Sequence, residues 1–206
     1  WRPTPDFLAF TRAQGGAISK AQCRSLGISP PVVRRLISQG WWVSLLPGVY
    51  QVAGETTWLA RAWAGILTGG PNAVIGAESA AYLHALMPQP NEITIYSSAQ
   101  IQPTPGWCFV RGHRQGVGTL PRTRVAETIL DLAGDLRADE LLALIADAVV
   151  TRKVTVDRLR VALNDRQRQA QRTLLLQAIG QTTRGVRSAL EGRYHRDVEV
   201  AHGLPA

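Results

Sequence analysis

Two adjacent arginines, Arg34 and Arg35, are the side chains of this 206-residue chain with the clearest chemical potential. A guanidinium group is permanently charged and presents a planar fork of donors that fits phosphate oxygens and guanine edges. Both arginines lie in segment 30–39, where apolar side chains recur at helical spacing on the opposite face. We therefore expect a helix whose outer face contacts DNA through Ser29, Pro31, Arg34, Arg35 and Ser38.

The residues around this helix predict the elements that would position it. Ser19 can cap a short helix over 20–26, and Gly27 then supplies a turn. The second helix starts at Pro30, where a missing N–H costs nothing. An apolar run over 41–46 is followed by Pro-Gly and a second run, which is typical of a hairpin. The segment therefore predicts a winged helix-turn-helix whose second helix enters the DNA major groove.

Composition agrees with a nucleic-acid partner. The net charge is +8, the pI is about 10.5, and Lys and Arg total 23 against 15 Asp and Glu. Arginine-rich chains also arise from GC-rich genomes, so the charge is supporting evidence only. A second basic run is interpreted as a solvated helix face in preference to a phosphate-contact surface: Arg158, Arg160, Arg166, Arg168 and Arg172.

The sequence does not indicate a catalytic site or a metal site. Glu78 and His84 are six residues apart and so do not share a helix face. Cys23 and Cys108 are far apart and lack clustered histidines, which argues against a zinc site. We therefore expect no catalytic residues, no metal and no cofactor. No run of 18 apolar residues is present, so we expect no membrane association and a cytoplasmic location.

The predicted fold class is α+β, with three parts. Residues 1–54 form the winged helix-turn-helix DNA-binding domain, 55–182 a mostly helical α/β domain, and 183–206 a C-terminal helix. Trp41 and Trp42 are expected to be packing residues. The apolar sides of two helices in the middle domain are expected to be buried: Ala80, Leu83, Leu86, Ile129, Leu130 and Leu132.

Three segments in a fixed order resemble one known family. GGAISKAQCRSLGISPPVVRRLISQGWWVSLLPGVYQV, AVIGAESAAYLHAL and LPRTRVAETILDLAG together extend over about residues 15–134. They are similar to AbiEi-type antitoxins, the regulators of type IV toxin–antitoxin systems. The resemblance implies a winged helix followed by an antitoxin domain, repression of the regulator's own promoter, and a nucleotidyltransferase-like toxin encoded nearby. One departure is the wing, which carries no Arg or Lys over 41–46.

The last residues resemble the opening of a very-short-patch-repair-like endonuclease domain. RSALE at 187–191 and VEVAHGLP at 198–205 carry this similarity. Glu191 would match an early acidic position, while the other acidic residues and the lysine of such a site would lie beyond Ala206. A lone glutamate cannot hold a metal and orient water, so we do not expect this chain to be a nuclease.

The leading hypothesis is a DNA-binding, antitoxin-like transcriptional repressor that recognises its own promoter region on double-stranded DNA. One alternative is a protein-interaction module, in which residues 55–180 dock a toxin or a further C-terminal domain and the winged helix serves as a scaffold. Another is the regulatory half of a nuclease whose catalytic core lies beyond residue 206. The winged helix alone does not decide among them, because this fold also serves in protein binding.

Overall fold

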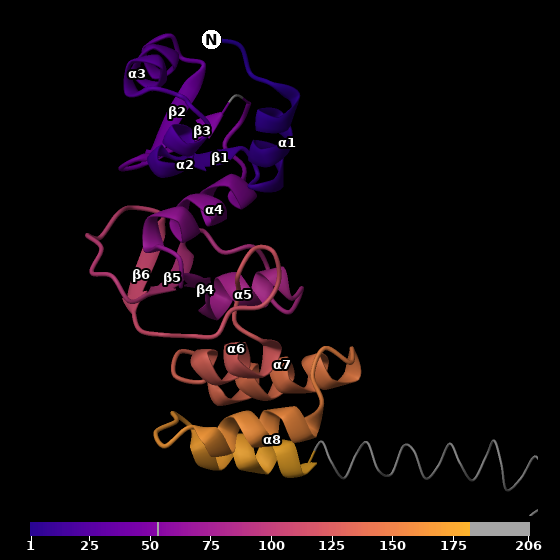
Figure 1. Cartoon of the computed structure of the whole chain (residues 1–206). Helices are drawn as coiled ribbons and strands as arrows, with labels where there is room; N and C mark the ends of the chain where they lie inside the picture. Colours follow the sequence, from indigo (N-terminus) through magenta and orange to yellow (C-terminus); the bar gives the residue numbers. More distant parts are fainter. Residues whose placement is uncertain (53, 182–206) are drawn as a thin grey trace, which may run out of the picture. The chain divides into compact units, whose positions relative to one another are not determined.

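The chain divides at Arg124 into two units in a computed structural model that describes residues 1–52 and 54–181 (Figure 1). The first unit is Trp1–Arg124 and the second is Val125–Ala206. Helices combine with two small sheets in the first unit, and the described part of the second unit is helical. The fold class is α+β, as predicted. The domain boundary that we expected after residue 54 falls inside the first unit.

The first unit begins with the predicted helix-turn-helix and wing. The wing strands join a third strand in an antiparallel sheet of order β1-β3-β2, with Ser19 of β1 opposite Val49 of β3. A turn at Pro47 and Gly48 closes the hairpin. The elements are α1 (Pro5–Ala13), β1 (Ala17–Ser19), α2 (Lys20–Ser25), α3 (Pro30–Ser38), β2 (Trp42–Leu46) and β3 (Val49–Val52).

Local signals explain the ends of these helices. Ser19 Oγ accepts from the Gln22 backbone N–H at 3.2 Å, and Gln22 Oε1 accepts from the Ser19 N–H at 2.9 Å, which completes a capping box on α2. Gly27 has a φ of 73°, which favours glycine in the turn between α2 and α3. Ser29 is the N-cap residue of α3, but its side chain makes no capping hydrogen bond.

A small core holds the helix-turn-helix against the wing. Trp42 is 4% exposed and stacks on Phe7, with ring centroids 6.0 Å apart. Trp41 is 68% exposed, so the expectation that it is a packing residue is wrong. Trp42 is the first residue of β2 and lies in the core, whereas Trp41 is in the bend between α3 and that strand and faces solvent. The buried members are Phe7, Ile18, Cys23, Ile28, Val33, Leu36 and Trp42.

Helix α4 (Trp58–Gly69) contacts both sheets of the first unit (Figure 1). Its small residues allow this close approach: a Cβ on Gly65 would lie 2.8 Å from Ile95 Cγ1. Leu46 and Val49 of the wing share one core with Ile95 of the second sheet. That sheet has the order β4-β5-β6, antiparallel and then parallel. Its elements are β4 (Val74–Ile75), α5 (Ala77–Leu83), β5 (Ile93–Ser97) and β6 (Trp107–Arg111).

The second unit is helical over its described residues. It contains α6 (Val125–Leu132), α7 (Ala138–Val150), α8 (Val156–Asp165) and a further helical run over 172–181. The expected burial is confirmed for Ala80 in the first unit and for three residues here, Ile129, Leu130 and Leu132. It is wrong for Leu83 and Leu86 of the first unit, which are half-buried.

The predicted C-terminal helix over 183–206, with Glu191, lies outside the described residues. Among the residues that are described, no helix is both long and apolar enough to span a lipid bilayer.

Candidate nucleic-acid interface

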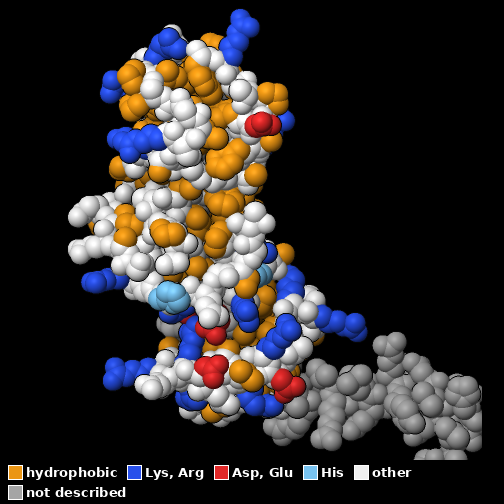
Figure 2. Space-filling view, in the orientation of Figure 1, with side chains coloured by type: hydrophobic (Ala, Val, Ile, Leu, Met, Phe, Trp, Pro, Cys, Tyr) orange, Lys and Arg blue, Asp and Glu red, His pale blue; other side chains and the backbone are white. Residues whose placement is uncertain are grey.

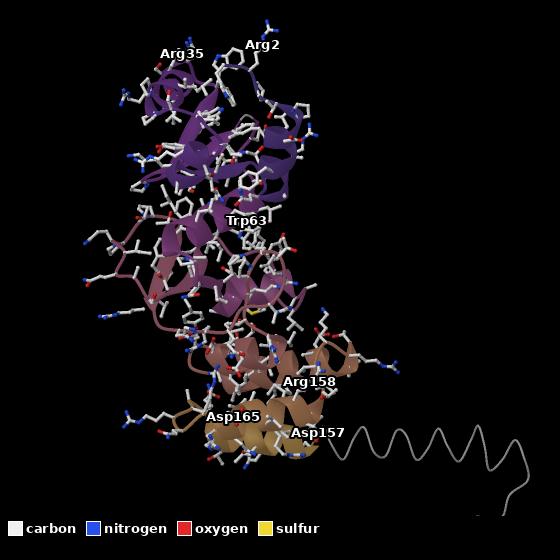
Figure 3. All side chains as sticks on the ribbon, viewed as in Figure 1. Arg2, Arg35, Trp63, Asp157, Arg158 and Asp165 are labelled. Atoms are coloured by element: carbon white, nitrogen blue, oxygen red, sulfur yellow. The ribbon has the colours of Figure 1, made fainter. Side chains whose placement is uncertain are left out.

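Helix α3 separates its apolar and polar residues onto opposite faces. Val33 and Leu36 are 5% and 7% exposed and pack into the small core. Four of the predicted contact residues lie on the opposite face, the fifth, Ser29, is the N-cap residue of the helix, and all five are exposed: Ser29, Pro31, Arg34, Arg35 and Ser38. Figure 3 labels Arg35 where it projects outward from this helix. The helix is therefore fixed through one face and leaves the other open to a partner.

The polar groups of these residues differ in whether they already form hydrogen bonds within the protein. Within the described part of the chain, no hydrogen bond or ion pair involves the guanidinium of Arg34 or Arg35. Ser38 Oγ donates to Arg35 O at 2.9 Å, so its proton is used within the helix. Ser29 Oγ makes no capping hydrogen bond and can donate to an external acceptor. The two arginines and Ser29 are thus the groups most ready to bind a phosphate or a base edge.

Lys20 lies beside the turn of the wing. Its backbone N–H donates to Gly48 O at 2.7 Å, and its Cβ is 3.8 Å from the position that a Cβ on Gly48 would occupy. The side chain is exposed. The wing's own sequence has no cation over 41–46, and this lysine supplies one next to the turn. Sequence reasoning missed it because the proximity depends on the pairing of β1 with β3.

A basic face extends from α3 over α2. Lys20 and Arg24 are both exposed and are four residues apart on α2, which places them on the same side of that helix. Figure 2 shows Lys and Arg side chains projecting at the left edge of the view, at the level of α2 and α3. With Arg34 and Arg35 they give four cations on the helix-turn-helix. Such a surface attracts the phosphate backbone of a nucleic acid.

The other residues with potentially reactive side chains have structural roles or lie apart from one another. His84 Nε2 is 2.8 Å from Thr123 O, so the ring ties the end of α5 to a distant segment. Glu78 lies in the first turn of α5 and His84 follows its last residue, so the two form no catalytic pair. Burial raises the pKa of the Cys23 thiol to about 11, which keeps it protonated and unreactive at neutral pH. No group of three or more His, Cys, Asp and Glu among the described residues could hold a metal ion.

The second basic run, in the other unit, is only partly solvated. Arg158, Arg160 and Arg168 are exposed, as expected. Arg166 is 18% exposed and forms ion pairs with Glu127 and with Asp131, the latter at 2.9 Å. Arg172 Nη1 donates to two backbone carbonyl oxygens, those of Leu163 and Arg166, both at 2.9 Å. The solvated-face interpretation is therefore wrong for these two arginines, which hold the second unit together.

Comparison with known proteins places a regulatory family over the same segment. Residues 7–53 match the family model described as "Transcriptional regulator, AbiEi antitoxin". This match supports an antitoxin-like regulator with a DNA-binding winged helix, and it describes a regulatory family, not a catalytic one. It gives no support to the endonuclease resemblance at 187–205. No curated protein matches the chain.

A solved structure has a similar fold. The crystal structure of the RV2827C protein from Mycobacterium tuberculosis aligns with a TM-score of 0.51 at 16% sequence identity. The alignment covers 85% of this chain and 73% of that chain. At this level of identity the likeness concerns the fold alone.

Proposed function

We propose that this chain is a DNA-binding, antitoxin-like transcriptional repressor that recognises its own promoter region through α3. The observation that carries the proposal is the outer face of α3, where Arg34 and Arg35 are exposed and are not engaged by any described residue. The opposite face is buried through Val33 and Leu36, so the helix is held rigidly for docking. The match of residues 7–53 to a family of transcriptional regulators supports the same function.

Each side chain of this surface suits a different kind of contact with DNA. Arg34 and Arg35 can each donate a bidentate pair of hydrogen bonds to guanine or to a phosphate. The Ser29 hydroxyl can donate to a phosphate, and Ser38 can accept from a base amino group. Pro31 has no polar side-chain atom and suits an apolar contact, such as a thymine methyl group. Lys20 beside the wing would neutralise a flanking phosphate without reading sequence.

The partners follow from the same proposal. Double-stranded DNA upstream of the protein's own gene is the first partner, and the cytoplasm is where it would be met. A nucleotidyltransferase-like toxin encoded nearby is the second. The description of the matching regulator family names an antitoxin, which supports a toxin partner, and the nucleotidyltransferase class comes from the sequence resemblance alone.

The test replaces both arginines of α3. Arg34→Ala with Arg35→Ala should weaken binding to the upstream duplex by about 2–4 kcal/mol, or roughly 30- to 1,000-fold, because base and phosphate contacts are both lost. The thermal midpoint should not change, since both side chains are exposed. Arg12→Ala removes another exposed arginine of the same unit and is the matched control. Fluorescence anisotropy titrations in which the double variant binds as the parent does would disprove this role for α3.

A second candidate function is a protein-interaction module. Trp41 and Val43, which follow α3, are 68% and 48% exposed, and large exposed apolar side chains favour protein partners. Trp41→Ser with Val43→Ser should then reduce co-purification with a co-expressed toxin while DNA affinity is retained. Loss of DNA affinity in this variant would instead assign these residues to the DNA interface.

A further inference from the structure

Strand β6 is an edge strand of the second sheet, whose order is β4-β5-β6 (Figure 1). An edge strand presents backbone N–H and C=O groups that can form hydrogen bonds with another extended chain. We propose that β6 pairs antiparallel with β6 of a second copy of this chain, so that two three-stranded sheets join into one sheet of six strands. This inference goes beyond the proposed function and does not depend on DNA binding.

The other edge strands of the two sheets, β1, β2 and β4, are less suited to such pairing. Strand β1 has three residues and β4 has two. The outer edge of β4 is also covered, because Ile75 N–H donates to Pro121 O at 2.8 Å and Ile75 O accepts the Thr123 N–H at 2.9 Å. Strand β2 has a register shift between Ser44 and Leu46, and such a bulge disrupts regular pairing. Strand β6 keeps its register with β5 over all five residues.

The outward backbone groups of β6 belong to Phe109 and Arg111. The Gly112 N–H donates to Ser97 O of β5 at 2.9 Å. Every second residue of a strand turns its N–H and C=O to the same neighbour, so Val110 also faces β5, whereas Phe109 and Arg111 face away. No backbone group among the described residues forms a hydrogen bond with the outward groups of these two. The edge thus offers two donors and two acceptors.

An antiparallel pair centred on Val110 satisfies all of these groups. Phe109 of one copy then lies opposite Arg111 of the other, and the two-fold axis repeats this arrangement. Residues opposite each other at such a site exchange both of their N–H···O=C hydrogen bonds, so the outward groups of both copies are paired. This match of the edge with itself favours a second copy as the partner.

The side chains favour the same register. Val110 is 36% exposed and would lie opposite the Val110 of the other copy, which removes apolar surface from water. Arg111 is exposed and Phe109 is half-buried. Their cross-strand pairing places each guanidinium beside a phenyl ring, which is a favourable cation–π arrangement. No two like charges lie directly opposite each other, so the pairing carries no such electrostatic cost.

Sedimentation velocity of the full chain without DNA tests this pairing. The parent should dimerise increasingly between about 1 and about 300 µM, since a short edge buries little surface and gives a weak dimer. Val110→Lys places two ammonium groups opposite each other and should leave only monomer. Val43→Lys makes the same change at an exposed valine of β2 and should keep the dimer. Neither variant should change the thermal midpoint, because both valines are exposed.

A disulfide tests the register. Residues opposite each other at the centre of the pair have Cα atoms about 4.5 Å apart, which is within reach of a disulfide. Val110→Cys with Cys108→Ser should therefore give a cross-linked dimer on mild oxidation, seen on a non-reducing gel. The parent should not cross-link through Cys108, since the two copies of this residue would be offset by about 13 Å along the strands.

The outcomes separate this inference from the proposed function. A parent that is monomeric at every concentration would overturn the pairing, and so would a dimer that Val110→Lys leaves intact. Loss of the dimer in Val43→Lys alone would assign self-association to the wing instead. Cross-linking of the parent through Cys108 would disprove the register. Arg34→Ala with Arg35→Ala should keep the dimer, so a failure to bind DNA leaves the pairing of β6 to be judged by sedimentation.

Discussion

Residues 1–124 contain eleven Lys and Arg against four Asp and Glu, whereas residues 125–206 contain twelve against eleven. In the second unit several arginines are engaged internally, as Arg166 is with Glu127 and Asp131. In the first unit Arg34 and Arg35 stand exposed on a helix that is buried through its other face. Arginine thus stabilises the second unit and is available for binding in the first. The two roles differ in whether the guanidinium already has a partner within the protein.

The largest effect that would test this comparison is expected at Arg166. Arg166→Met should destabilise the second unit by about 3–5 kcal/mol, because it removes the guanidinium that pairs with the Asp131 carboxylate, whose side chain is only 3% exposed. Chemical denaturation measures the change. Arg168→Met removes an exposed arginine two residues away and should change stability little. Equal stability of the two variants would show that the buried pair does not hold this unit.

A second variant tests whether stability in this unit is separate from binding. Leu130 is 1% exposed, and Leu130→Ala should cost about 2–5 kcal/mol through lost apolar burial and the cavity that remains. At temperatures below the unfolding transition its affinity for DNA should equal that of the parent, since the proposed contacts lie in the first unit. A thermal midpoint unchanged by the substitution would contradict the placement of Leu130 in the core.

A smaller effect is expected at the wing. Lys20→Ala should lower the salt slope of DNA binding by about 0.9, with similar losses on specific and scrambled duplexes, because one phosphate contact is removed. Lys20→Arg keeps the charge and should bind as the parent does. A change in sequence preference would instead mean that Lys20 reads a base.

The smallest effect concerns an exposed ion pair of the second unit. Arg137 donates to Asp139, and this hydrogen bond holds the pKa of Asp139 below its ordinary value. The stabilisation is therefore present above the ordinary pKa of aspartate and is lost as the pH falls through the folded-state value. Arg137→Gln should raise the pKa of Asp139 towards its ordinary value, measured by carboxyl NMR titration, with no measurable loss of stability. An unchanged pKa would show that the pair is not formed in solution.

The winged helix could be predicted because its signals are local. Ser19, Gly27 and Pro30 act on their immediate neighbours, and the structure places them at a cap, a turn and a helix start. Arg166 was misassigned because Glu127 and Asp131 are 39 and 35 residues away in the sequence, and only the packing of the helices brings them together. The proximity of Lys20 to the wing turn was missed for the same reason, since it depends on a strand pairing that composition does not encode.

Helix α4 has a consequence for how this protein can evolve. The segment that matches the regulator family ends at residue 53, yet Leu46 and Val49 of its wing are buried in a core that α4 and the second sheet complete. A gene fusion that transferred only residues 1–54 would therefore expose these side chains to water and yield an aggregation-prone, poorly folded fragment. The unit that recombination can move intact is longer than the unit that sequence similarity detects, and it includes α4.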